Sequence, residues 1–353
     1  MKLQGQSIQI LNSDLKEPNL VWLDVKNAPF SLHGIFFEEA ENCFLRIPKA
    51  VAKSTSPAVS NLNYSTAGGR IRFRTNSSTI AVAARLHRIP NRPSMAAAGV
   101  SGFDLYRTDE EGDNFVHTFI PTTPTCDRYE KAVKTDGKLA EYTINFPLYC
   151  GVKSLLIGLE AGCELSQAAP YPNDLPVVFY GSSITQGASA SRPGIAYQAY
   201  LSRWLNFDYI NLGFSGACKA EPAMAEYFEA FPMKAFVYDF DHNVRNTEEL
   251  KEKHLPFYRR VRAAHPDLPI LFISAPDVML HKGDFFARRE LIRRNFEQAK
   301  QEGDTNLWYI DGATLFGTED HLECTVDSTH PNDLGFYRMA KTIRPILEEM
   351  MNK

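Results

Sequence analysis

The chain has 353 residues, a length that corresponds to about two domains of ordinary size. Hydrophobic residues make up 44% and charged residues 23%, which is typical of globular proteins and excludes disordered and collagen-like chains. The net charge is −4, from 38 Lys and Arg against 42 Asp and Glu, so nucleic acid is not an expected partner.

Membrane partners and disulfide bonds are not expected either. No stretch of about 18 consecutive apolar residues occurs, and the polar first residues lack the apolar core of a secretory signal. A cytoplasmic location is therefore expected, with secretion left open if a leader has been removed. The cysteines form no CxxC pair, which favours reduced thiols over a disulfide framework or a zinc knuckle. They are Cys43, Cys126, Cys150, Cys163, Cys218 and Cys324.

The N-terminal part of the chain, from about residue 20 to 165, has the pattern of short strands separated by turns. Polar and apolar residues alternate over 70–74 and again over 80–86, which predicts a hairpin of two half-buried strands. Segments 103–106, 115–119 and 154–159 repeat the pattern, with no amphipathic helix expected between them. Many short strands of this kind predict a β-sandwich or jelly roll.

A proline-rich segment then separates this strand-rich part from a part with a different sequence pattern. Its three prolines, Pro170, Pro172 and Pro176, disfavour regular structure and indicate an interdomain connection. We therefore predict two domains, a β-sandwich or jelly-roll-like accessory domain over 1–172 and a second domain over 173–353.

The second domain alternates apolar strands with helical segments. Strands are expected at 177–180, 209–212, 235–238, 270–273 and 307–310, and helices near 195–206, 221–230, 247–264, 284–302 and 332–351. Continuous apolar strands separated by helices are typical of a parallel sheet covered on both faces. The predicted fold class is therefore α/β, with a three-layer α/β/α domain.

Ligands of such sheets bind beyond the carboxyl ends of the strands, so the residues that follow each strand are candidates for chemistry. Ser183 follows the first strand in a Gly-Ser-Ser turn, where its hydroxyl could be exposed as a nucleophile. Gly213 and Gly216 follow the second strand, and a glycine lets the backbone approach a ligand closely. Each feature alone also fits an ordinary turn or helix cap.

The third strand and the last helix supply the other candidates. Asn243 follows the third strand, where a side-chain amide can donate a hydrogen bond to developing negative charge. Asp327 lies three residues before His330, so its carboxylate can accept the imidazole Nδ1–H and leave Nε2 as a base. An N-cap cluster is the alternative for this segment, and a metal site is not expected because no HExxH or CxxC motif accompanies His330.

The order of these elements, Ser, Gly, Asn and Asp-x-x-His, resembles that of the SGNH (GDSL-like) hydrolases over about residues 175–353. The resemblance implies that Ser183 is the nucleophile, that His330 is the general base and that Asp327 orients the imidazole. It also implies an oxyanion hole made by the backbone N–H groups of Ser183 and Gly216 and the side chain of Asn243. Gly216 is preferred to Gly213 because the family glycine occurs in a Ser-Gly pair.

Two departures from the family pattern stand out. Ser182 replaces the aspartate of the usual GDS block, and the third block reads Asp241-His242-Asn243-Val244 instead of GxND. The sequence leaves open whether Asp241 and His242 contact substrate or only stabilise the loop. It also leaves open whether Arg192, after the nucleophile turn, reaches the substrate.

The layout of a strand-rich domain before an SGNH domain resembles that of carbohydrate esterases that remove acetyl groups. The resemblance implies a serine esterase that acts through an acyl-enzyme on a small-molecule ester, an acetylated saccharide, without cofactor or metal. One alternative is a lipase, thioesterase or arylesterase on the same scaffold, since the acyl pocket decides specificity. Another is a glycan-binding protein with a degenerate hydrolase domain. A homo-oligomer is compatible with the sequence, which does not define the oligomeric state.

Overall fold

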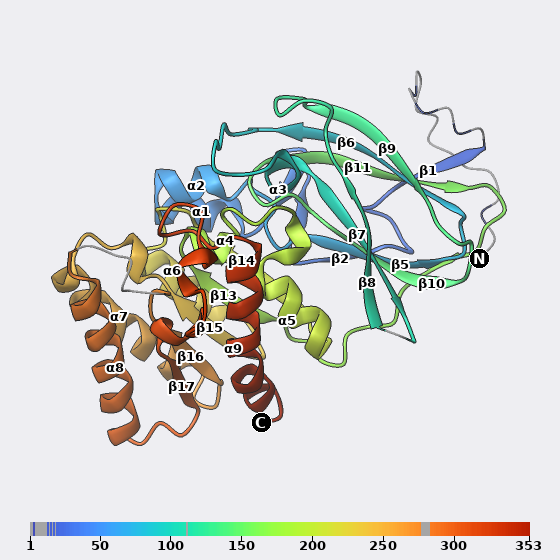
Figure 1. Ribbon diagram of the computed structural model, residues 1–353. Coiled ribbons are helices and arrows are strands. Elements are labelled where there is room, and N and C mark those ends of the chain that lie inside the picture. Colours follow the sequence, from blue (N-terminus) through green and yellow to red (C-terminus); the bar gives the residue numbers. More distant parts are fainter. Residues whose placement is uncertain are drawn as a thin grey trace. The chain divides into compact units, whose positions relative to one another are not determined.

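The computed structural model describes residues 3, 13, 15, 17, 19–110, 112–276 and 283–353 (Figure 1). The chain divides into two compact units that are not continuous in sequence. Unit 1 comprises Met1–Arg46, Tyr64–Pro170 and Ser191–Gly194, and unit 2 comprises Ile47–Asn63, Tyr171–Ala190 and Ile195–Lys353. The domains 1–172 and 173–353 stay a prediction, and the compact units differ from them mainly by 47–63 and 191–194.

Unit 1 is built from antiparallel sheets. One sheet has the order β1(Leu20–Asp24)-β11(Gly151–Glu160)-β6(Thr79–His87)-β9(Arg128–Lys134). A second has the order β12(Leu165–Ser166)-β5(Arg70–Thr75)-β10(Ala140–Asn145)-β7(Phe103–Asp109)-β8(Gly112–Phe119), with β2(Ser31–His33) beside β5. The strands β3(Phe36–Glu38) and β4(Cys43–Leu45) form a separate pair.

The predicted hairpin of 70–74 and 80–86 is wrong, because β5 and β6 belong to different sheets. Ile71 and Phe73 of β5 and Ile80 and Val82 of β6 are all buried in one apolar cluster. The two strands therefore present their apolar faces to a shared core, and the alternation that suggested a hairpin reflects this burial. A β-sandwich is confirmed for this part of the chain.

Three short helices interrupt the strand-rich region in which no helix was expected. They are α1 (Lys49–Thr55), α2 (Pro57–Leu62) and α3 (Ala97–Ser101). Each has seven residues or fewer, which is too short to show the apolar period of a helix. Ala52 of α1 and Val59 of α2 are buried in the apolar cluster of unit 2, which explains why these helices belong to that unit.

Unit 2 contains a parallel sheet of the order β14(Tyr209–Gly213)-β13(Val177–Gly181)-β15(Ala235–Asp239)-β16(Ile270–Ile273)-β17(Leu307–Ile310). The helices that follow the strands are α4(Ser183–Gln186), α5(Tyr197–Leu205), α6(Pro222–Ala230), α7(Thr247–Ala264), α8(Phe285–Gln301) and α9(Asp333–Met351). Short 3-10 turns occur at η1(Pro193–Ile195), η2(Asp241–Asn243), η4(Gly312–Thr314) and η5(His321–Cys324). Every residue of β13, β15 and β16 is buried.

The two faces of this sheet are covered by different helices (Figure 1). Tyr180 and Phe236 share an apolar cluster with residues of α6, α7 and α8. On the other face, Phe179 packs edge-on against Tyr197 of α5, which stacks on Phe336 of α9. The predicted three-layer α/β/α domain is confirmed. Because β13, β14 and β15 are parallel neighbours, their carboxyl ends lie together at the same end of the sheet.

Three further features bear on the expectations from the sequence. None of the six cysteines forms a disulfide bond. Within the described ranges, every helix is too short or too polar to cross a bilayer. The described residues also contain no group of three His, Cys, Asp or Glu side chains that could hold a metal ion.

Candidate active site

Ser183 is the first residue of the short helix α4, directly beyond the buried strand β13. The hydroxyl of Ser182 accepts a hydrogen bond from the Ile184 N–H at 3.2 Å and so caps the helix. The helix ends after one turn at Gly187, whose φ of 99° favours glycine. Ser182 thus has a structural role at the position where the family pattern has aspartate.

The two candidate glycines after β14 have different surroundings. A Cβ at Gly213 would lie 2.1 Å from the backbone nitrogen of Gln186, so glycine is required for α4 to approach the end of β14. Gly216 has a φ of +71°, and nothing lies within 4 Å of a Cβ added there. The structure therefore gives Gly213 a packing role and leaves Gly216 beside open space. The oxyanion role of Gly216 stays a prediction.

Asp327 and His330 occupy a tight turn before α9. The Val326 N–H donates to the His330 carbonyl at 2.9 Å, and an isolated β-bridge joins Thr325 to Pro331. Ser328 adopts a φ of 65° within the turn. The Asn332 side chain then caps α9 by accepting from the Gly335 N–H at 3.0 Å. Because the turn is closed on itself, it fixes the spacing of the Asp-x-x-His pair.

The structure brings together Ser183, His330 and Asp327. Ser183 Oγ lies 2.9 Å from His330 Nε2, and His330 Nδ1 lies 2.8 Å from Asp327 Oδ2. With Asp327 ionised, Nδ1 carries a hydrogen and donates a hydrogen bond to the carboxylate, so Nε2 accepts a hydrogen bond from the serine hydroxyl. This order of contacts is the one that nucleophilic catalysis by serine requires.

The carboxylate of Asp327 is held in its ionised form by the same turn. Its Oδ1 accepts the backbone N–H of His330 at 2.8 Å and that of Thr329 at 3.2 Å. Partial burial raises the pKa of Asp327, but the hydrogen bonds from the His330 backbone and imidazole outweigh it, and the pKa is lowered overall. An ionised Asp327 is the form that orients and stabilises an imidazolium.

Asn243 is the last residue of η2, beyond β15. Its side-chain nitrogen donates to the Phe214 carbonyl at 3.1 Å, and the Phe214 N–H donates to the Gly181 carbonyl at 2.9 Å. The loop that carries Gly216 is therefore tied both to Asn243 and to the end of β13. Within the described residues, the N–H groups of Ser183 and Gly216 donate no hydrogen bond, which leaves them available to an oxyanion.

Asp241 and His242 stabilise the loop that ends at Asn243. The carboxylate of Asp241 is buried and accepts the Ala275 N–H at 2.9 Å, while its backbone carbonyl accepts from Arg288 at 2.8 Å. Burial raises the pKa of Asp241 to about 6. The ring of His242 packs against that of Phe285, with centroids 5.3 Å apart. Of the two roles that the sequence left open for Asp241, its contacts fit the loop.

Several polar side chains that support the nucleophile turn were missed by the sequence reasoning. Asp239 is buried at the end of β15 and accepts the Thr185 hydroxyl at 2.8 Å. The Thr185 carbonyl accepts the side-chain amides of Gln198 and Asn211, each at 2.7 Å. Position at the carboxyl end of a strand was the available signal for Asp239, and a polar residue inside an apolar strand was the signal for Asn211. Nothing in the sequence singled out Gln198.

Arg192 forms part of unit 1 and lies against an aspartate of β7. Its guanidinium donates to Asp104 Oδ2 at 2.9 Å, and the Gly194 N–H donates to the same oxygen at 2.7 Å. The second oxygen of Asp104 accepts from the Asn145 side chain at 2.8 Å. A Cβ at Gly194 would lie 2.4 Å from the Tyr106 ring, so glycine is required for this close approach. Arg192 is therefore held by a buried carboxylate.

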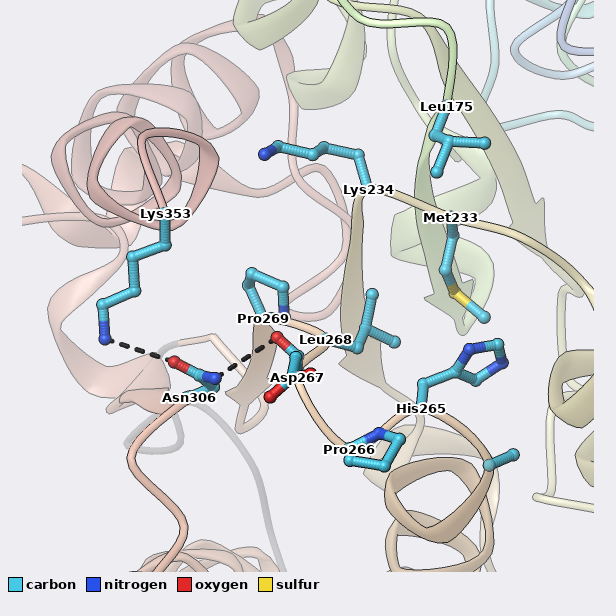
Figure 2. A pocket seen from close by; sticks show the side chains of 11 residues that line it. Leu175, Met233, Lys234, His265, Pro266, Asp267, Leu268, Pro269, Asn306 and Lys353 are labelled. Atoms are coloured by element: carbon cyan, nitrogen blue, oxygen red, sulfur yellow. Dashed lines mark hydrogen bonds between the residues drawn. The ribbon is translucent and has the colours of Figure 1, made fainter.

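The cavity drawn in Figure 2 lies at the amino ends of the strands, whereas Ser183 follows the carboxyl end of β13. It has a volume of about 670 Å³ and contains none of the expected site residues. Its lining comes from the segments that lead into the strands, among them Leu175 before β13, Met233 before β15 and Leu268 before β16. In a parallel α/β sheet, ligand sites form at the carboxyl ends instead, so this cavity is not the candidate active site.

The fold and the Ser183 turn define a serine ester hydrolase, and comparison with known proteins agrees. Residues 174–348 match the model of the GDSL-like lipase/acylhydrolase family. Residues 20–165 match the model described as the N-terminus of SGNH-hydrolase-type esterases, named GxDLY. The chain belongs to the GDSL-like lipase/acylhydrolase family. The pattern in the second model's name occurs here as Gly102-Phe103-Asp104-Leu105-Tyr106, which includes the aspartate that holds Arg192.

Solved structures similar to the chain cover nearly all of it. A protein of Bacteroides ovatus, described as a candidate GDSL-like lipase, is 31% identical, with a TM-score of 0.84 over 95% of this chain and 98% of its own. A salicylyl-acyltransferase from a tetracycline biosynthetic pathway is 19% identical, with a TM-score of 0.78 over 95% and 98%.

More distant likeness extends to a family two carbohydrate esterase from Clostridium thermocellum, solved in complex with cellohexaose. It is 14% identical, with a TM-score of 0.61 over 92% of this chain and 99% of its own. At such identities the acyltransferase and the carbohydrate esterase show a shared fold alone. Among curated proteins no match was found.

Proposed function

We propose that this enzyme is an esterase that removes acetyl groups from O-acetylated saccharides, with Ser183, His330 and Asp327 as its catalytic triad. The observation that carries the proposal is the unbroken line of contacts from Ser183 Oγ through the imidazole to the Asp327 carboxylate, at 2.9 and 2.8 Å. A degenerate hydrolase domain has no need of this arrangement, so the glycan-binding alternative is disfavoured.

The first half-reaction forms an acyl-enzyme. Ser183 Oγ bonds to the acetyl carbon while His330 Nε2 takes the serine proton, and the carbonyl electron pair moves onto its oxygen. The N–H groups of Ser183 and Gly216 and the Asn243 amide donate to that oxyanion. Collapse breaks the bond between the acetyl carbon and the sugar oxygen, which receives its proton from His330. Each oxyanion donor of this kind contributes about 3–4 kcal/mol in the transition state.

The second half-reaction restores the enzyme. His330 takes a proton from water as the water oxygen attacks the acetyl carbon, and the ester bond to Ser183 breaks with the proton returned to Oγ. The products are acetate and the free sugar hydroxyl. A sugar or other alcohol in place of water would give acyl transfer, so the test must measure released acetate directly.

The choice of an acetylated saccharide is supported by the named relatives of similar fold. They include carbohydrate esterases and an acetyl xylan esterase from Butyrivibrio proteoclasticus, which is 13% identical with a TM-score of 0.60. The two-part layout of a β-sandwich and an SGNH domain extends over nearly the whole length of these proteins. A lipase or thioesterase would differ in its preference for longer acyl chains.

The decisive variant is Ser183→Ala, assayed with p-nitrophenyl acetate and octanoate and by acetate release from acetylated xylo- and cello-oligosaccharides. We expect Ser183→Ala to lower kcat by about 10⁴-fold or more with an unchanged melting temperature. Ser54→Ala in α1, whose hydroxyl bonds only within its helix, is the matched control and should retain activity. Activity retained by Ser183→Ala would remove Ser183 as the nucleophile, and rates that rise with acyl length would favour the lipase reading.

A further inference from the structure

Three aromatic side chains gather on the outer surface of unit 2, where α5 and α9 lie side by side. The Tyr200 and Trp204 rings of α5 have centroids 5.2 Å apart, and the Tyr337 ring of α9 lies 5.7 Å from Tyr200 and 5.9 Å from Trp204. Tyr337 is 41% exposed, and the other two rings are partly exposed. The rings therefore form a continuous aromatic surface that is open to solvent.

A cationic side chain lies over each ring of this surface. Arg203 lies over Tyr200 at 5.0 Å, Lys341 over Tyr337 at 5.7 Å and Arg344 over Trp204 at 5.6 Å. Lys341 and Arg344 are exposed and, within the described residues, form no ion pair with a carboxylate. We call Tyr200, Trp204 and Tyr337 with these three cations the α5–α9 aromatic face. Three cations thus lie over the rings, while the acidic residues on the same side of α9, Asp333 and Glu348, lie one turn before Tyr337 and one turn after Arg344.

The spacing along α9 aligns the aromatic face with the loop of the catalytic base. Tyr337, Lys341 and Arg344 are spaced four and three residues apart, so they share one side of the helix. The helix begins at Asp333, three residues after His330, and Tyr337 is about one turn further on. A chain molecule that extends from His330 along this side of α9 would cross the aromatic face.

The chemistry of the face selects its ligand. Aromatic rings offer flat apolar surfaces on which the C–H faces of a sugar can lie, and Arg and Lys donors recognise carboxylates. A neutral saccharide would use only the rings, and a simple anion would use only the cations. A saccharide whose sugars carry carboxylates uses both. Lys341 and Arg344 beside the rings thus complement the carboxylates of uronic acids.

We propose that the α5–α9 aromatic face binds uronic-acid residues of an acidic oligosaccharide chain whose ester is presented to Ser183. This inference rests on the proposed saccharide esterase function and adds the class of saccharide. It assigns Tyr337 and Trp204 to stacking and Lys341 and Arg344 to the sugar carboxylates.

Calorimetric titration of the intact protein with trigalacturonic acid tests the proposal, with its trimethyl ester as the uncharged probe. We expect the acid to bind at least tenfold more tightly than the ester at low salt, and the difference to shrink in 0.5 M NaCl. The double variant Lys341→Gln/Arg344→Gln should lose this preference, and Trp204→Ala/Tyr337→Ala should weaken binding of both probes about tenfold or more. Lys300→Gln/Arg294→Gln, at two cations of α8, is the matched control and should bind as the wild type does.

Hydrolysis of p-nitrophenyl acetate separates this inference from the proposed function. All three double variants should keep that activity, which also shows that they fold. Equal binding of the acid and its ester, or binding unaffected by the α5–α9 variants, would overturn the inference. So would a dimer in sedimentation that Tyr337→Ala dissociates, because a second copy would then cover the face. If trigalacturonate binds as expected but no ester is cleaved, the proposed function fails while the binding site stands.

Discussion

Each unit of the molecule buries an aspartate, and the two are stabilised in different ways. Asp104 of unit 1 is fully buried and accepts from the Arg192 guanidinium, the Gly194 N–H and the Asn145 side chain. Asp239 of unit 2 accepts the Thr185 hydroxyl, and no cation in the described part of the chain pairs with it. Burial raises the pKa of Asp239 to about 7.

The contrast shows two ways in which a fold can accommodate a buried carboxyl group. A charge taken out of water must be paired or neutralised by a proton. The β-sandwich unit pairs its carboxylate with an arginine. The α/β unit instead raises the pKa of its carboxyl, which accepts a hydrogen bond from Thr185 of the nucleophile turn. The predictions below test this difference.

The largest effect on stability is expected from Asp104→Ala. The substitution leaves a partly buried Arg192 without its carboxylate, and breaking a buried pair in this way costs about 3–5 kcal/mol. The Gly194 N–H and the Asn145 side chain also lose their acceptor. Calorimetric unfolding should show the loss, and the transition affected should be that of unit 1.

Asp136→Ala is the matched control for this prediction. Asp136 pairs with Arg107 in the same unit, at 2.9 Å, but at an exposed position where ion pairs contribute little. Its melting temperature should stay near that of the wild type. If Asp104→Ala melts like Asp136→Ala, the buried pair does not hold unit 1 together.

Asp239→Asn should change stability much less, because the asparagine resembles the protonated form that burial favours. Its effect should appear in the pH dependence. A pKa raised from 3.8 to about 7 means that the folded state binds more protons than the unfolded state between these values. The contribution of Asp239 to stability should therefore fall as pH rises from about 4 to about 7.

The variant should remove the Asp239 contribution from the pH dependence of the melting temperature, while Asp241, with its pKa raised to about 6, keeps a contribution of the same direction. Asp239→Ala is the contrasting variant, since it also removes the acceptor of the Thr185 hydroxyl. An Asp239→Asn profile with the wild-type slope would show that Asp239 is ionised in the fold.

The two aspartates also mark what the sequence could and could not predict. The α/β/α domain was predictable because buried parallel strands produce continuous apolar runs, as in β13 and β15. Ser183 and the Asp-x-x-His pair were predictable because strand ends and a short turn fix their positions locally. Asp239 was detectable as a polar residue at a strand end, but its neighbours in space could not be inferred.

Contacts between segments that are distant in the chain could not be predicted from the sequence. Asp104 and Arg192 are 88 residues apart, and no periodicity links them. The placement of β5 and β6 in different sheets could not be predicted either, since alternation indicates which face of a strand is buried but not which strand lies beside it. Trp308, expected in a buried strand, is partly exposed and donates to Glu349 at 3.1 Å, because β17 is an edge strand.

The smallest effect is expected at Glu249, a third carboxylate with the opposite sign of pH dependence. Partial burial raises its pKa, but hydrogen bonds from Arg245 and Lys253 outweigh it and lower the pKa to about 2. The unfolded state therefore binds more protons below the ordinary value of 4.5, and stability is lost as pH falls from 4.5 toward 2.

Glu249→Gln should lower the melting temperature slightly at pH 7 and should make it less sensitive to acid below pH 4.5. Glu252→Gln, at an exposed position of the same helix, is the matched control and should keep the wild-type acid profile. If the acid profiles of both variants coincide with the wild type, the ion pairs of Glu249 are too well solvated to matter. The opposite slopes expected for Asp239 and Glu249 in one chain follow from their partners, since Asp239 meets a hydroxyl and Glu249 meets two cations.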